Sequence, residues 1–103
     1  MKRPKRVRVG NHDFDYLYGT IEADDRYVYG RMNPRHTQIL IDDSNAESQI
    51  RDTVLHETLH AIWSDAPHIL DSETEEQVVR ALTPGLLSVM RENPKLVAYL
   101  LEK

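Results

Sequence analysis

Apolar and polar side chains alternate along much of the first forty residues, which is the pattern of half-buried β-strands. The alternation runs through residues 6–9 and 13–18, and strand-like runs follow at residues 26–30 and 36–41. Between the first two runs, Gly10-Asn11 favours either a tight hairpin turn or a bulge. These runs predict a three- or four-stranded antiparallel sheet.

Beyond residue 42 the apolar spacing becomes that of helices. Ser44 and Glu47 fit a capping box that opens a helix from Ala46 to about Trp63. One half of this helix is apolar, and we expect that half to pack against the sheet. It comprises Ile50, Val54, Leu55, Thr58, Leu59, Ala61 and Ile62.

Two more helices are predicted in the C-terminal third of the chain. The first runs from about Ser72 to Leu82, where Thr83-Pro84 favours a kink or a restart because proline suits the first turn of a helix. Asn93-Pro94 repeats this signal and opens a short last helix. The predicted fold class is α+β, a single domain over residues 1–103 with the strands first and the helices after them. Four apolar residues near the C-terminus are expected to pack in the core: Leu86, Leu87, Met90 and Leu101.

The composition narrows the chemistry that the chain can perform. Apolar residues make up 40% of the 103 residues and charged residues 29%, which fits a soluble globular domain. The absence of cysteine excludes disulfides and thiolate metal sites. No apolar run is long enough to span a membrane, and no signal-peptide core follows the basic N-terminus. We therefore expect a cytoplasmic protein without a membrane partner.

The formal net charge of −4 conceals an uneven distribution. Residues 1–8 hold five basic side chains and no acid, whereas acids outnumber bases in the rest of the chain. A basic arm is compatible with nucleic-acid binding, but an acidic body would repel a polyphosphate. We therefore favour a solvated terminus or a charged edge strand, and nucleic acid stays a weaker partner. The basic residues are Lys2, Arg3, Lys5, Arg6 and Arg8.

One motif on the first predicted helix indicates metal chemistry. Residues 55–61 contain His-Glu-x-x-His, with His56, Glu57 and His60 in the defined positions. Residues four apart lie on the same helix face, so both imidazoles can reach one zinc ion. Glu57 lies beside that metal and is placed to take a proton from a zinc-bound water. The alternative is two histidines on a solvated helix face.

Two histidines leave the site one protein ligand short. On the second predicted helix, Glu75 lies at the middle of an apolar stripe, where an unpaired buried carboxylate is costly. Glu76 lies at the margin of the stripe and Glu73 outside it. We therefore take Glu75 as the third ligand and Glu76 as the next choice, with His68 weaker still. The alternative is that these acids bind no metal and only stabilise the helix, because negative side chains interact favourably with the positive end of its dipole.

A strand over residues 37–41, the His-Glu-x-x-His helix and a Glu-bearing helix together resemble the gluzincin branch of zinc metallopeptidases. More narrowly, the chain is similar to the minigluzincins and to small phage or prophage proteins related to the ImmA/IrrE-type peptidases. The resemblance covers most of the chain from about residue 30 onward. It implies zinc held by His56, His60 and a glutamate, with water in the fourth position and Glu57 as general base. It also implies that an extended substrate pairs with the strand at Gln38, Ile39 and Leu40.

The resemblance leaves two parts of the site open. Gluzincins often carry a small or polar pair three and four residues after the ligand Glu. Val78 and Val79 hold these positions after Glu75, whereas Glu73 is followed there by Glu76 and Gln77. The group that would stabilise the oxyanion is also undecided. The candidates are His68, Tyr16, Tyr27 and Tyr29, and Trp63 either packs under the site or lines it.

These observations support three functions. The first is a peptidase that hydrolyses a peptide or protein substrate with a zinc-activated water and Glu57. The second is a zinc-stabilised regulatory or interaction domain that cleaves little, which the short chain favours because few residues remain to build substrate pockets. The third is a protein that the basic N-terminus holds close to DNA.

Overall fold

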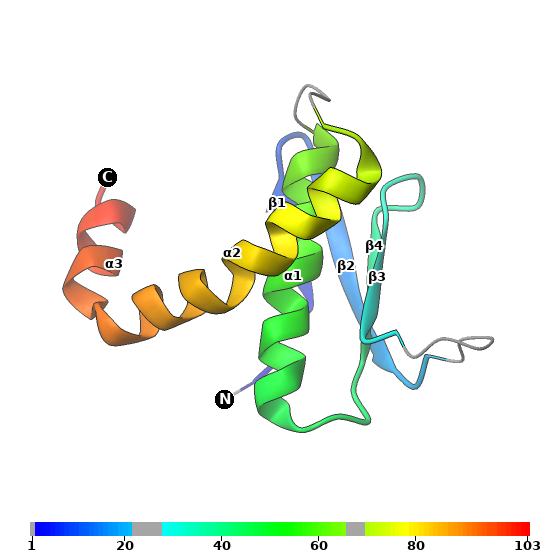
Figure 1. Cartoon of the computed structure of the whole chain (residues 1–103), viewed down its shortest axis with the longest axis horizontal. Coiled ribbons are helices and arrows are strands. Elements are labelled where there is room, and N and C mark those ends of the chain that lie inside the picture. Colours follow the sequence, from blue (N-terminus) through cyan, green and yellow to red (C-terminus); the bar gives the residue numbers. More distant parts are fainter. Residues whose placement is uncertain (1, 22–27, 66–69) are drawn as a thin grey trace.

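The structure is a computed structural model that describes residues 2–21, 28–65 and 70–103. Its strands and helices follow one another in the order that the sequence predicts, with the strands first (Figure 1). The elements are β1 (Arg6–Val9), β2 (His12–Gly19), β3 (Gly30–Asn33), β4 (Gln38–Asp42), α1 (Glu47–Asp65), α2 (Ser72–Glu92) and α3 (Pro94–Leu101).

The four strands form one mixed sheet in the order β1-β2-β4-β3. β1 and β2 form a hairpin, which is one of the two alternatives that the sequence left open, and its two-residue turn places Gly10 at a φ of 59°. β3 and β4 are also antiparallel, but β2 and β4 run parallel, so the expectation of a wholly antiparallel sheet was wrong. Alternation determines which face a strand buries, but not which strand becomes its neighbour.

Strand boundaries differ from the prediction around β3. The third strand was expected over residues 26–30, but β3 begins at Gly30 and ends at Asn33. Residues 26 and 27 lie outside the described residues. Thr37, with a φ of 50°, closes the turn that leads into β4.

One face of the sheet carries the core and the other carries ion pairs. Phe14, Tyr16, Ile39 and Ile41 point to the buried face, where α1 covers them (Figure 1). On the opposite face, residues that are paired across β1 and β2 form ion pairs. Arg6 lies 2.9 Å from Asp15, and Arg8 lies 3.2 Å from Asp13.

Part of the basic N-terminus, from Arg6 onward, forms the edge strand β1, and the residues before it contact the body. Arg3 forms a charge-assisted hydrogen bond to Glu47 at 2.9 Å, and the Tyr18 hydroxyl donates to the carbonyl oxygen of Pro4. Three of the five basic side chains near this end are thus paired with acids. Ion pairs thus offset part of the positive charge near the N-terminus.

Helix α1 packs through a face rotated from the predicted one. Its buried residues are Ile50, Thr53, Glu57 and Ala61, whereas Ile62 is exposed. The expected capping box is also absent, since the Ser44 hydroxyl donates to the Asp42 carboxylate at 2.6 Å. The rotation brings Glu57 toward the sheet, where the sequence pattern predicts apolar residues.

Helix α2 lies across α1 and begins at an N-cap, because the carboxylate of Asp71 accepts from the backbone N–H of Thr74 at 2.7 Å. It continues through Pro84 without a restart. Its buried residues are Val79 and Thr83, and Leu82 is exposed. No helix in the described residues is both long and apolar enough to cross a membrane.

Candidate metal centre

The centre lies where α2 crosses α1. On α1, His56 and His60 lie one turn apart, and their ring centroids are 5.0 Å from one another. On α2, Glu76 shares the buried face because it precedes Val79 by three residues and Thr83 by seven. The two helices therefore bring both histidines to one carboxylate.

Glu76 lies between the two imidazoles. Its Oε1 atom is 2.7 Å from Nε2 of His56, and its Oε2 atom is 3.4 Å from Nε2 of His60. Among the described residues, one ligand atom from each of His56, His60 and Glu76 lies within 4.8 Å of the others. A group with this spacing could hold a metal ion.

Glu75 contacts the same histidine from the other side. Its Oε2 atom lies 2.6 Å from Nδ1 of His60. A carboxylate only accepts, so Nδ1 is the donor, and in the neutral ring Nε2 then carries the lone pair that faces Glu76. Two facing acceptors repel one another unless a cation or a proton lies between them.

The oxygen Oε1 of Glu76 gives a second indication of a cation. It is buried, yet no hydrogen bond reaches it, because the short approach of His56 Nε2 lacks hydrogen-bond geometry. An unsatisfied buried carboxylate oxygen is costly, whereas a metal ion bound between it and the imidazoles would satisfy it. The residues present therefore fit a metal ion.

Glu57 lies beside this group and is nearly buried, with 8% of its surface exposed. Its Oε2 atom is 4.0 Å from Nε2 of His56. Burial raises the pKa of the Glu57 carboxyl to about 7, while the charge of His60 lowers it and that of Glu76 raises it. The acid is thus held next to the candidate ligands and is not a member of that group.

Gly30 explains how α1 approaches the sheet so closely at Glu57. A Cβ atom at this position would lie 2.7 Å from Cγ2 of Thr53, 2.8 Å from the carbonyl oxygen of Leu40 and 3.1 Å from Cγ of Glu57. Only glycine leaves room for these three contacts. Sequence reasoning missed this role, although an isolated glycine next to a strand is a signal of close approach.

A cleft of about 640 Å³ opens beside the centre, between α1, α2 and the beginning of β3. His56, Glu57 and Glu76 line it together with Arg80, which lies one helical turn beyond Glu76. Among the ion pairs of the described residues, none involves Arg80. Arg80 was not among the residues predicted from the sequence, although it follows Glu76 by four residues. The other lining residues are Val28, Tyr29, Gly30, Gln49, Asp52 and Thr53.

The other residues that the sequence singled out for the site lie in different parts of the structure. Tyr29 lines the cleft, whereas the Tyr16 hydroxyl contacts Oγ1 of Thr58 at 2.6 Å within the core. Glu73 is exposed, and the lining residues described above do not include Trp63. Tyr27 and His68, two of the four candidates for the oxyanion-stabilising group, lie outside the described residues.

The strand expected to bind substrate has no free edge. β4 pairs with β2 on one side and with β3 on the other, through the register that includes Gln38, Ile39 and Leu40. Ile39 is also completely buried. A substrate strand therefore cannot add to β4, since its backbone groups are already paired. The described strand with an open edge next to the cleft is β3.

Comparisons of the chain with models of protein families, with curated proteins and with solved structures found no match.

Proposed function

We propose that the chain is a zinc-dependent peptidase-like hydrolase that binds its metal through His56, His60 and Glu76. One observation carries the proposal: two Nε2 atoms and an unsatisfied carboxylate converge beside a buried glutamate, Glu57. Two imidazoles and one carboxylate are a ligand set that zinc uses in catalytic sites, where a water takes the fourth position. A bound zinc would acidify that water and polarise a substrate carbonyl.

Glu57 is the proposed general base. It neighbours the first histidine in the sequence, and its carboxylate approaches His56 Nε2 without taking the place of a ligand. Its burial against Gly30 limits the positions that the side chain can adopt. From there it would receive the proton of the attacking water and pass it to the leaving amine.

Glu75 is proposed as a positioning residue, in place of the ligand role expected from the sequence. Its hydrogen bond to Nδ1 of His60 fixes the tautomer that leaves Nε2 free for the metal. Carboxylates often orient metal-bound histidines in this way. Glu76 therefore replaces Glu75 as the proposed third ligand.

The substrate is proposed to be an extended peptide that adds to the open edge of β3. Gly30 and Tyr29 bring the beginning of this strand to the cleft, so a peptide paired with β3 would pass the metal ligands. Main-chain hydrogen bonds would supply affinity, as they do when peptides extend a sheet. Arg80 would face the substrate carbonyl and stabilise its developing negative charge.

The test compares the wild-type protein with Glu57→Gln on a mixed peptide library, with products identified by mass spectrometry. Both proteins should bind one zinc per chain by elemental analysis. Cleavage by the variant should fall by about 10²- to 10⁴-fold, which is the usual contribution of a general base. Glu73→Gln, an exposed change on α2, is the matched control and should cleave like the wild type.

The same experiment separates the peptidase from a zinc-stabilised domain that does not cleave. Zinc binding by the wild type together with no cleavage beyond the level of Glu57→Gln would reject the peptidase proposal and favour the interaction domain.

A further inference from the structure

Helix α3 has too little support within one chain. It is eight residues long, none of its residues is buried, and α2 is the helix on which it packs. Helices this short are marginal in water unless an apolar face is covered. Yet its large apolar residues are open to solvent: Tyr99 is 74% exposed, Leu101 73%, Leu100 66% and Leu96 43%.

The exposed apolar surface continues onto the second half of α2. This half and α3 project away from the sheet and from α1 (Figure 1), and we call residues 82–101 the C-terminal arm. The expectation that this segment packs in the core was wrong for Leu86, Met90 and Leu101, which are exposed. Leu87 is half-buried. The large exposed residues on the α2 part of the arm are Leu82, Leu86, Val89 and Met90.

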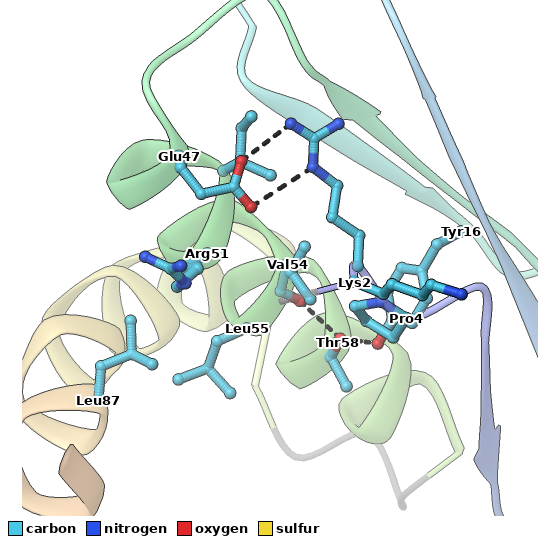
Figure 2. Close-up of a pocket in the computed structure, with 11 residues that line it drawn as sticks. Lys2, Pro4, Tyr16, Glu47, Arg51, Val54, Leu55, Thr58 and Leu87 are labelled. Atoms are coloured by element: carbon cyan, nitrogen blue, oxygen red, sulfur yellow. Dashed lines mark hydrogen bonds and ion pairs between the residues drawn. The ribbon is translucent and has the colours of Figure 1, made fainter.

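A second apolar surface lies open at the base of the arm. It is a groove of about 390 Å³ between the N-terminal residues 2–4 and α1 (Figure 2), and none of His56, His60 and Glu76 lines it. Leu55 of α1 and Leu87 of α2 both line it (Figure 2). Its remaining lining residues are Lys2, Arg3, Pro4, Tyr16, Glu47, Ile50, Arg51, Val54 and Thr58.

We propose that the chain forms a two-fold dimer in which α3 of each copy occupies the groove of the other. The chain's own α3 packs on α2 and does not line this groove, so both apolar surfaces are left uncovered in a single copy. A two-fold arrangement lets each copy both donate its α3 and receive one, which closes the assembly at two chains.

The available area matches what a stable dimer requires. Eight exposed side chains of the arm, at a burial of about 100 Å² each, would give about 800 Å² per copy, the contribution of one partner to an interface of standard size. An apolar surface of this extent is larger than monomeric proteins usually leave exposed.

The charges fit a second copy as the occupant. Arg91, Glu92 and Lys95 are the only charged residues of the arm, so two arms carry little mutual repulsion. Lys2 and Arg51 line the groove and offer positive charge. The carbonyl end of α3, followed by Glu102, is the negative end of the helix, and its approach to these two cations would set the direction in which α3 lies.

The absence of native cysteine makes disulfide cross-linking a direct test. The two single variants Leu55→Cys and Leu100→Cys are mixed, oxidised and separated without reductant, and we expect a 55–100 cross-link between chains. Leu17→Cys, exposed on the opposite face of the sheet, replaces Leu55→Cys in the control mixture and should give no such product. A product formed only between two Leu100→Cys chains would overturn the groove as the docking site.

Sedimentation analysis of the wild type should give twice the mass of one chain. Leu100→Lys should return the mass to that of one chain with an unchanged circular dichroism spectrum. Ala98→Lys, on the face of α3 opposite Leu96 and Leu100, should remain dimeric. The wild type is measured over a series of dilutions, and a protein that is monomeric at every concentration would overturn the proposal. A double variant Leu55→Cys/Leu100→Cys that stays monomeric and cross-links within one chain would also overturn it.

Discussion

Nδ1 of His60 lies 2.6 Å from the carboxylate of Glu75, while Nε2 of the same ring faces Glu76 at 3.4 Å. Consecutive residues of α2 thus contact opposite ring nitrogens of one histidine. A metal bound at Nε2 would make Glu76 a ligand and Glu75 the residue that orients the ring.

Alanine substitutions at these positions distinguish the two roles. Glu76→Ala removes a ligand and should weaken zinc binding the most. Glu75→Ala should weaken it by about 10- to 100-fold, the usual effect of losing a carboxylate that orients a metal-bound histidine. Glu73→Ala should leave the affinity unchanged because its side chain is exposed. Competition with a chromogenic chelator measures all three, and a larger loss for Glu75→Ala than for Glu76→Ala would reverse the assignment.

The sequence was sufficient for the part of the site that depends on local spacing. His56, Glu57 and His60 lie within one turn of helix, so their relative placement follows from helix geometry alone. The third ligand depends on which face of α2 meets α1. The apolar pattern favours a face that comprises Val78, Val79 and Leu82. Val79 is buried as expected, but Leu82 is exposed and the polar Thr83 is buried instead. That shift moves Glu76 into the group.

The same limit applies to the sheet and to the arm. Alternation identified the buried residues Phe14 and Tyr16, but the parallel pairing of β2 with β4 depends on contacts distant in the sequence. Leu100 and Leu101 are large apolar residues of the kind that usually pack in a core, yet both are exposed. A pattern of apolar residues indicates that a surface will be covered, but it does not say whether the same chain covers it.

Gly30→Ala should destabilise the protein and displace Glu57. The added Cβ would approach a backbone oxygen at 2.8 Å, and overpacking of this kind costs about 1–3 kcal/mol. Gly19→Ala is the matched control, since a Cβ at that position meets no atom within 4 Å. Urea unfolding of the two variants measures the difference. Equal midpoints would mean that α1 does not require the close approach at Gly30.

Asp71→Asn should change the dependence of stability on pH. Hydrogen bonds from Thr74 lower the pKa of the Asp71 carboxyl in the folded protein. A lowered pKa contributes stability above the ordinary value of an aspartate, about 3.9, and this contribution is lost as the pH falls through the folded value. Urea midpoints of the metal-free proteins should therefore differ at neutral pH and converge in acid. If the difference in urea midpoint between the wild type and the variant stayed constant from neutral to acid pH, the charge of Asp71 would contribute nothing to stability.

Arg80→Gln tests the proposed oxyanion contact. The loss of one such group typically lowers kcat by about 10²- to 10³-fold, and we expect kcat to fall while zinc content is retained. Arg91→Gln, on an exposed part of the same helix, should have no effect. An unchanged kcat with a raised KM would place Arg80 in substrate binding instead.

The most direct test of the central claim is a crystal structure of the zinc-loaded protein with anomalous diffraction measured at the zinc absorption edge. We predict one anomalous peak per chain, about 2.0–2.2 Å from Nε2 of His56, Nε2 of His60 and a carboxylate oxygen of Glu76. A structure without a peak at these atoms, or with a peak bonded to Glu75 in place of Glu76, would contradict the account.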